Sequence, residues 1–135
     1  MDIGKCLHCN SDFKFKKSQQ TGKYCSNICQ KQKEYLDKIF LWETKNIKPG
    51  ITTIKQYLKY KQQNKCSICL NSSWCDKNIP LEIDHISGIS DDNSIANLRF
   101  ICPNCHAQTP TYKNKNRGRG RQQRLKRYHQ NKTGL

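Results

Sequence analysis

The stretch LEIDHI, residues 81–86, decides the fold of the second half of the chain. Apolar and polar side chains alternate from Leu81 to Asp84, which is the period of a half-buried β-strand, and the alternation fails at His85-Ile86. The residues that follow, SGISDDN at positions 87–93, are mostly turn-forming types. The sequence therefore predicts a strand that ends in a polar turn.

A second strand and a short helix are expected after this turn. Residues 98–101 read LRFI, which suits a strand, and Pro103 suits the first turn of a helix over residues 103–109. If the two strands pair as a hairpin and the helix packs on them, Asp84 and His106 come close together. In ideal strand geometry His85 points away from Asp84, so a bend at the strand end would be needed to bring both to one place.

Two cysteine pairs frame this unit. The pairs Cys66-x-x-Cys69 and Cys102-x-x-Cys105 present four thiolates, which suits tetrahedral zinc. The alternative is a pair of redox dithiols, but these need a thioredoxin-like βαβ context that the pattern lacks. A four-cysteine site has no open coordination position, so this zinc is expected to be structural rather than catalytic.

A second four-cysteine group stands near the N-terminus, in the pairs Cys6-x-x-Cys9 and Cys25-x-x-x-Cys29. Residues 12–15 alternate like a short strand, and Ser26 suits the N-cap of a helix that runs to about Thr44. Together these features resemble a treble-clef-like zinc finger. His8 offers an alternative ligand, although four cysteines suffice, and the remaining Cys75 is expected to be neutral filler.

The bulk composition favours a reduced, metal-stapled protein. Only 34% of the 135 residues are hydrophobic, so the core is small and staples are needed. Nine cysteines leave at least one thiol unpaired in any disulfide scheme. The N-terminal sequence lacks an apolar signal region, and no apolar run is long enough to span a membrane. We expect a cytoplasmic protein that is not secreted.

The net charge of +15 indicates a polyanionic partner, and nucleic acid is the expected one. Compositional bias toward Lys and Asn is an alternative, but five of the six arginines fall within residues 117–127. A basic membrane-surface segment is another, but this stretch has almost no apolar face. The candidate nucleic-acid contacts are Lys113, Lys115, Arg117, Arg119, Arg121, Arg124, Lys126 and Arg127.

Three parts are predicted along the chain. Residues 1–50 form the zinc finger and its helix, residues 51–112 form the unit with the second zinc site, and residues 113–135 form a basic tail. Pro49-Gly50 separates the first two parts, and a further helix is expected to begin near Thr52. The tail is expected to be mobile without DNA, with a short helix from about Gln122 to His129. Its alternative interpretation is a solvated terminus without a role.

The combination of LEIDHI (81–86), NLR (97–99) and CPNCH (102–106) resembles the HNH endonuclease motif on a ββα-metal fold. The resemblance is greatest to small phage-type HNH proteins with a four-cysteine zinc site. It covers roughly residues 52–117 and includes HAQTPT at positions 106–111. It implies a small α+β, zinc-stapled protein whose nuclease module follows the N-terminal finger.

The resemblance also implies roles for single residues. His85 would be the general base, and Asp84 and His106 would hold a catalytic Mg²⁺ or Mn²⁺ ion beside the two structural zinc ions. Asn97 would fix the loop that aims His85. The implied reaction is metal-dependent hydrolysis of phosphodiester bonds in DNA, expected to be double-stranded, by nicking or by double-strand cleavage. Whether the protein acts alone or as a homodimer on DNA stays open.

Two other functional interpretations compete with the nuclease. A non-catalytic zinc-dependent DNA-binding protein, such as a phage regulator, explains the charge and the cysteines, and a zinc-stapled interaction adaptor explains only the cysteines. Asp84 and His85 alone could be structural, Asn97 could be a turn cap, and Glu82 is expected to face solvent or pair with a lysine. The remaining expectations are non-catalytic His8 and His129, a polar turn at Asp91, Asp92 and Asn93, and packing roles for Trp42 and Trp74.

Overall fold

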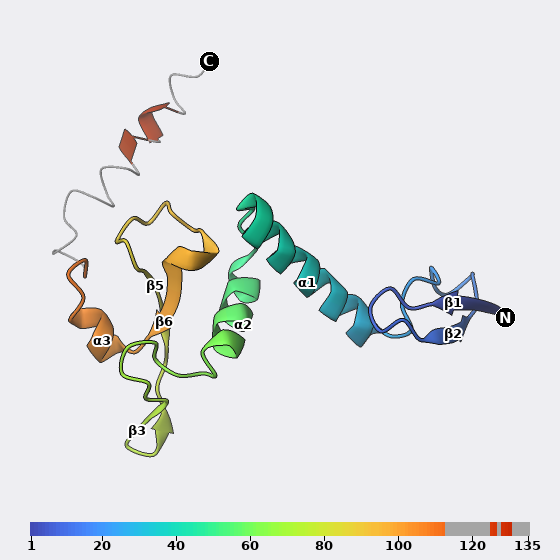
Figure 1. Ribbon diagram of the computed structural model, residues 1–135, viewed down its shortest axis with the longest axis horizontal. Helices are drawn as coiled ribbons and strands as arrows, with labels where there is room; N and C mark the ends of the chain where they lie inside the picture. Colours follow the sequence, from blue (N-terminus) through green and yellow to red (C-terminus); the bar gives the residue numbers. More distant parts are fainter. Residues whose placement is uncertain (113–124, 127, 131–135) are drawn as a thin grey trace. The chain divides into compact units, whose positions relative to one another are not determined.

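The computed structural model describes residues 1–112, 125–126 and 128–130. The chain divides into two compact units, Met1–Pro49 (unit 1) and Gly50–Leu135 (unit 2), and each is described by itself (Figure 1). Both are small α+β structures built on two-stranded antiparallel sheets. Among the described residues, no helix combines the length and the apolar character that a bilayer span requires.

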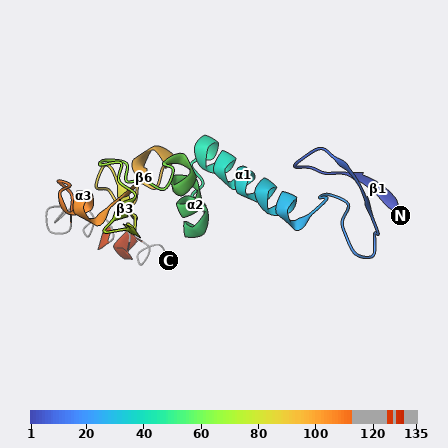
Figure 2. The same ribbon diagram turned by 90° about the horizontal axis from the view of Figure 1, so that it is seen from below.

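Unit 1 consists of a hairpin followed by one long helix. Its elements are β1 (Asp2–Lys5), β2 (Asp12–Phe15) and α1 (Asn27–Lys45). Ser26 is the N-cap of α1, as predicted, because its hydroxyl accepts a hydrogen bond from Cys29 N at 3.2 Å. The helix ends at Asn46 in the left-handed conformation, and Figure 2 shows it as one continuous helix.

The buried side of α1 is narrow. Ile39 and Trp42 are buried, and this confirms the packing role predicted for Trp42. Leu36 and Phe40 are exposed. The strand β1 was not predicted, because its sequence, DIGK, has low intrinsic strand propensity and is held by pairing with β2.

Unit 2 combines two short hairpins with helices. Its described elements are α2 (Ile51–Lys61), β3 (Ser73–Trp74), β4 (Lys77–Asn78), β5 (Glu82–His85), the 3₁₀ turn η1 (Ile95–Asn97), β6 (Leu98–Ile101) and α3 (Pro103–Ala107). The strands β5 and β6 are antiparallel, with Asp84 opposite Arg99. The helix α3 contacts β5, and α2 contacts β6.

The core of unit 2 is built around cysteines. Ile101, Cys66 and Cys102 are fully or almost fully buried, and Ile79 and Leu81 pack against them. Ile54, Leu58 and Phe100 are also buried in this unit, but a core of this size still leaves the cysteine group a large share of the stabilisation.

Gln62, the C-cap of α2, fastens this helix to β6. Its Nε2 donates to the carbonyl of Phe100 at 2.9 Å, and its Oε1 accepts from the N–H of Phe100 at 2.8 Å. One side-chain amide therefore satisfies both backbone polar groups of one strand residue.

The predicted strand–turn–strand–helix order is present, with shorter elements. The strand expected over residues 81–86 spans Glu82–His85, and the helix expected over residues 103–109 spans Pro103–Ala107. The helix ends early because the N–H groups of Gln108 and Thr109 bond to carbonyls three residues back, which tightens the last turn.

The hairpin of β3 and β4 was not predicted. Its two turn residues, Cys75 and Asp76, both have positive φ angles, 49° and 60°, as in a type I′ turn. The dipeptide Cys75-Asp76 is not one of the Asn-Gly, Asp-Gly or Gly-Gly pairs that mark such turns in a sequence. Trp74 is 69% exposed on β3, so the packing role expected for it is wrong.

Candidate metal centres and active site

Four cysteines of unit 2 converge on one point. The Sγ atoms of Cys66, Cys69, Cys102 and Cys105 all lie within 4.8 Å of one another. Cys69 and Cys102 are 3.8 Å apart, which is the separation of about 3.8 Å expected for sulfurs placed tetrahedrally around zinc. A disulfide needs about 2.05 Å, so the group fits a zinc ion and not a cystine.

The cysteines of unit 1 form a second group of the same kind, Cys6, Cys9, Cys25 and Cys29. Cys25 lies 3.6 Å from Cys9 and 3.5 Å from Cys29. In both groups one pair comes from a knuckle and the other from the start of a helix. The spacing differs because Cys102 is itself the N-cap of α3, whereas Cys25 precedes the N-cap Ser26. His8 is not part of the group formed by the described residues.

The two knuckles share one backbone conformation. The residue after the second cysteine is left-handed in each, Asn10 with φ 60° and Leu70 with φ 62°. Its N–H bonds to the carbonyl of the first cysteine at 3.0 Å in both knuckles. Asparagine tolerates this conformation, but leucine is strained in it.

Each group contains one thiol that ionises easily and one that resists ionisation. Burial raises the pKa of the Cys66 thiol, but hydrogen bonds from the backbone of Cys102, Cys69 and Ile68 outweigh it and set the pKa at about 6. Burial and the neighbouring cysteine side chains raise the pKa of Cys105 to about 12. In unit 1 the corresponding pKa values are about 6 for Cys6 and about 12 for Cys25. A dication stabilises thiolates, so it would ionise each whole group.

A carboxylate and an imidazole lie beside the cysteine group of unit 2. The Oδ1 atom of Asp84, which is 5% exposed, lies 3.8 Å from Nε2 of His106. Asp84 comes from β5, and His106 follows the group member Cys105 in α3. Two bonds of about 2.0–2.2 Å can bridge this separation, so the pair can hold one divalent cation.

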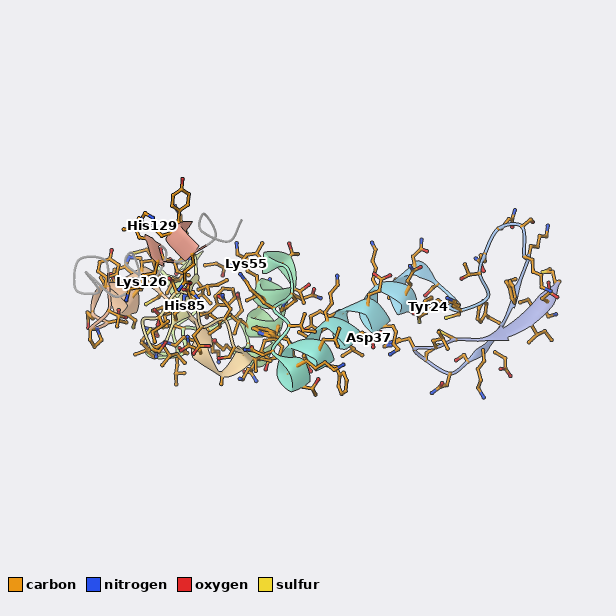
Figure 3. All side chains as sticks on the ribbon, turned by 90° about the horizontal axis from the view of Figure 1, so that it is seen from above. Tyr24, Asp37, Lys55, His85, Lys126 and His129 are labelled. Carbon is orange, nitrogen blue, oxygen red and sulfur yellow. The ribbon has the colours of Figure 1, made fainter. Side chains whose placement is uncertain are left out.

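His85 lines the same hollow as this pair. The hollow has a volume of about 140 Å³ and is lined by Ile83, Asp84, His85, Gly88, Ser90, His106 and Thr111. The chain turns sharply after His85, where the N–H of Gly88 bonds to the His85 carbonyl at 2.8 Å. His85 itself still pairs with Leu98 in the β5–β6 ladder, so the turn begins directly after it. His85 Nε2 contacts Oδ1 of Asn93 at 3.0 Å, and Figure 3 shows His85 among the side chains of unit 2.

Asn97 braces the loop between β5 and β6. It is buried, its Oδ1 accepts from Ser87 N at 2.9 Å, and its Nδ2 donates to the carbonyl of Asp92 at 2.7 Å. Its own carbonyl accepts from Ile86 N at 2.9 Å. One residue therefore joins the two sides of the loop that carries Asn93. Hydrogen bonds from the Ser94 side chain and backbone lower the pKa of Asp92, which keeps this part of the loop anionic.

Ser90 adds an unfilled polar position to the hollow. Its Oγ is buried and has no hydrogen-bond partner among the described residues. Buried polar groups are normally paired, so a water or an anion oxygen in the hollow would complete this site. The lining thus brings the Asp84–His106 pair, a second histidine and a hydroxyl to one place.

Two charged residues hold the Asp84–His106 pair from outside, and neither contact was predicted from the sequence. Glu82 Oε2 lies 2.5 Å from Nδ1 of His106, and Arg99 Nε donates to Oδ2 of Asp84 at 2.8 Å. Glu82 is exposed, as expected, but its partner is His106 rather than a lysine. Side chains alternate between the two faces of a strand, so Glu82 and Asp84 lie on the same face of β5. The alternation in LEIDHI could have predicted this from the sequence.

Most of the candidate nucleic-acid contacts lie outside the described residues. These are Lys113, Lys115, Arg117, Arg119, Arg121, Arg124 and Arg127. Lys126 is described and labelled in Figure 3; it is helical and exposed. The helix expected from about Gln122 to His129 is described only at residues 125, 126, 128 and 129, which are helical.

The β5–β6 hairpin and α3 carry Asp84, His85 and His106, the residues that the resemblance to the HNH motif singles out. A curated protein, the H-N-H endonuclease F-TflIV of Escherichia phage T5, is 52% identical to this chain over 56 residues. The matched segment is 42% of this chain and 25% of that protein, so it spans a quarter of the relative's length. This match confirms the resemblance to the HNH family. No family model matches the chain, and no solved structure matches it significantly.

Proposed function

We propose that unit 2 is an HNH nuclease module of the ββα-metal type and that the protein hydrolyses phosphodiester bonds of double-stranded DNA. The observation that carries the proposal is the single hollow lined by Asp84, His85 and His106. The similarity to a phage protein named as an H-N-H endonuclease supports the same conclusion. The net charge of +15 suits a DNA substrate.

Asp84 Oδ1 and His106 Nε2 would hold one Mg²⁺ or Mn²⁺ ion. When bound, this cation supplies positive charge to the phosphate and to the departing O3′. Asp84 is kept in place by Arg99, and His106 by the α3 helix that the cysteine group anchors. The two zinc ions are assigned structural roles, because four-cysteine sites leave no position for substrate.

His85 is assigned the role of general base. If Asn93 Oδ1 accepts a hydrogen bond from Nε2, the other ring nitrogen, Nδ1, is free to take a proton from water. The water oxygen then bonds to phosphorus and the bond from phosphorus to O3′ breaks. O3′ takes a proton from a solvent water and His85 later returns its proton to solvent, so the products carry 5′-phosphate and 3′-hydroxyl ends. Asn97 keeps the base aimed by bracing the loop that carries Asn93.

Incubation with supercoiled plasmid tests the proposal. Purified protein loaded with zinc should convert the plasmid to nicked or linear forms when Mg²⁺ or Mn²⁺ is added, and a reaction without added metal should not. Chelator is best kept out of the first comparison, because it also strips structural zinc.

The alternative function, zinc-dependent DNA binding without catalysis, is favoured by the same positive charge. It predicts that the protein retards the plasmid in a gel and leaves it intact with either metal. That result would overturn the nuclease proposal.

A further inference from the structure

Four charged or ionisable side chains form a continuous series across β5, β6 and α3. In order they are Glu82, His106, Asp84 and Arg99, joined at 2.5 Å, 3.8 Å and 2.8 Å. The inner two are the proposed cation ligands. Glu82 contacts Nδ1 of His106, and Arg99 contacts Oδ2 of Asp84. These are the atoms of the two ligands that would not bind the cation.

We propose that Glu82 is a positioning residue that sets the tautomer of His106. This inference rests on the proposed function of the hollow. A carboxylate oxygen beside Nδ1 can only accept, so in the neutral ring the proton stays on Nδ1 and the lone pair stays on Nε2. Nε2 is the nitrogen that faces Asp84. The contact thereby presents the ligand nitrogen to the cation in its unprotonated form.

The geometry gives Glu82 this role rather than a role in stability. Glu82 is half exposed and His106 about a quarter exposed, and an ion pair at such a surface adds little to folding. Histidine ligands commonly donate their second ring nitrogen to a carboxylate, and loss of that partner lowers metal affinity by about 10–100-fold.

Two substitutions separate the effect of the Glu82 charge from the effect of its hydrogen bond to His106. Glu82→Gln keeps an oxygen that can accept from Nδ1 but loses the charge, and Glu82→Ala loses both. Both variants have the same net charge, so any difference between them reports the hydrogen bond. Glu34→Ala on α1, where Glu34 is exposed and accepts from Gln30, is the matched charge control.

The first readout is the nitrogen-15 spectrum of histidine-labelled protein, at a pH well above the ordinary histidine pKa of about 6.5. The His106 signals are assigned by their loss in His106→Ala. Wild type, Glu82→Gln and Glu34→Ala should show the Nδ1–H form. Glu82→Ala should shift toward the Nε2–H form.

The second readout is Mn²⁺ affinity of the zinc-loaded protein, measured by electron paramagnetic resonance. Glu82→Ala should bind Mn²⁺ about 10–100-fold more weakly than wild type, and Glu82→Gln should fall closer to wild type. Wild-type tautomer and affinity in Glu82→Ala would overturn the inference. A wild-type protein that binds no Mn²⁺ and cuts no DNA would instead overturn the proposed function, while the spectrum still decides whether Glu82 sets the tautomer.

Discussion

Asp84 and Arg99 lie directly opposite each other in the β5–β6 ladder, and Arg99 Nε donates to Asp84 Oδ2 at 2.8 Å. The Asp84 side chain is 6% exposed and the Arg99 side chain 25%. Oδ1 of the same carboxylate faces His106. Arg99 and the proposed cation would therefore share one carboxylate, each through its own oxygen.

Arg99→Met should destabilise unit 2 by about 1–3 kcal/mol when no Mg²⁺ or Mn²⁺ is present, because it leaves a nearly buried carboxylate without its partner. Added Mn²⁺ should stabilise the variant more than wild type, since the cation then has the carboxylate to itself. Urea unfolding with and without Mn²⁺ measures both effects. Equal stabilisation of the two proteins by Mn²⁺ would show that Arg99 and the metal do not share Asp84.

His85→Ala should slow DNA cleavage by about 10²–10⁴-fold, which is the usual effect of removing a positioned general base. Folding, zinc content and DNA binding should be unchanged, because His85 is not in either cysteine group. Plasmid nicking rates at saturating protein measure the effect, and His129→Ala is the matched control. Near-normal nicking by a rigorously purified variant would remove His85 from the mechanism.

The cysteine group and the Asp84–His106 pair should respond separately to mutation. Cys102→Ser should lose one zinc ion per chain and unfold unit 2, because binding of a structural zinc contributes directly to folding. His106→Ala should keep both zinc ions and lose Mn²⁺ affinity. Zinc-to-protein ratios and circular dichroism distinguish the two, with Cys75→Ser as the neutral control. A folded, active Cys102→Ser protein would mean that the four cysteines do not share one ion.

Leu70→Asn should stabilise unit 2 by about 0.5–1 kcal/mol, since leucine pays for a left-handed conformation that asparagine adopts readily. Leu70 is 68% exposed, so little apolar burial is lost. Asn10 already occupies the equivalent position in the first knuckle. Urea midpoints measure the change, and Ile68→Asn, exposed in the same knuckle, serves as control. A lower midpoint for Leu70→Asn would show that its side chain makes a contact that outweighs the backbone strain.

Deletion of residues 113–135 should flatten the salt dependence of DNA binding. Each phosphate neutralised contributes about −0.9 to the slope of log K against log salt, so engagement of half of the eight candidate contacts in residues 113–127 predicts a change of about 3–4 units. Cleavage at saturating DNA and low salt should largely survive, because Asp84, His85 and His106 remain. Binding titrations over a salt series compare the two proteins. Equal slopes would place the DNA-contacting charge elsewhere on the chain.

The local sequence pattern predicted some helices and strands and missed others. The N-cap Ser26, the strand ending at His85 and the proline-started helix α3 each follow from residues near in sequence. The β3–β4 hairpin was missed because Cys75-Asp76 carries no turn signature and is held in its conformation by the pairing around it. The partner of a side chain depends on strand register and on how a helix packs against the sheet. The contacts Asp84–Arg99 and Glu82–His106 therefore could not be predicted from the sequence and required the structure.

The contact between Gln62 and Phe100 has a consequence for self-association. A two-stranded sheet exposes unpaired backbone groups along its outer edges, where a strand of another molecule can add. The side-chain amide of Gln62 takes both hydrogen bonds that Phe100 would offer to such a strand. It therefore imitates the peptide group of an incoming chain and occupies its place. The residue that anchors α2 thus also covers the edge of β6 at Phe100, whose carbonyl in addition accepts from Ser67 N at 3.0 Å.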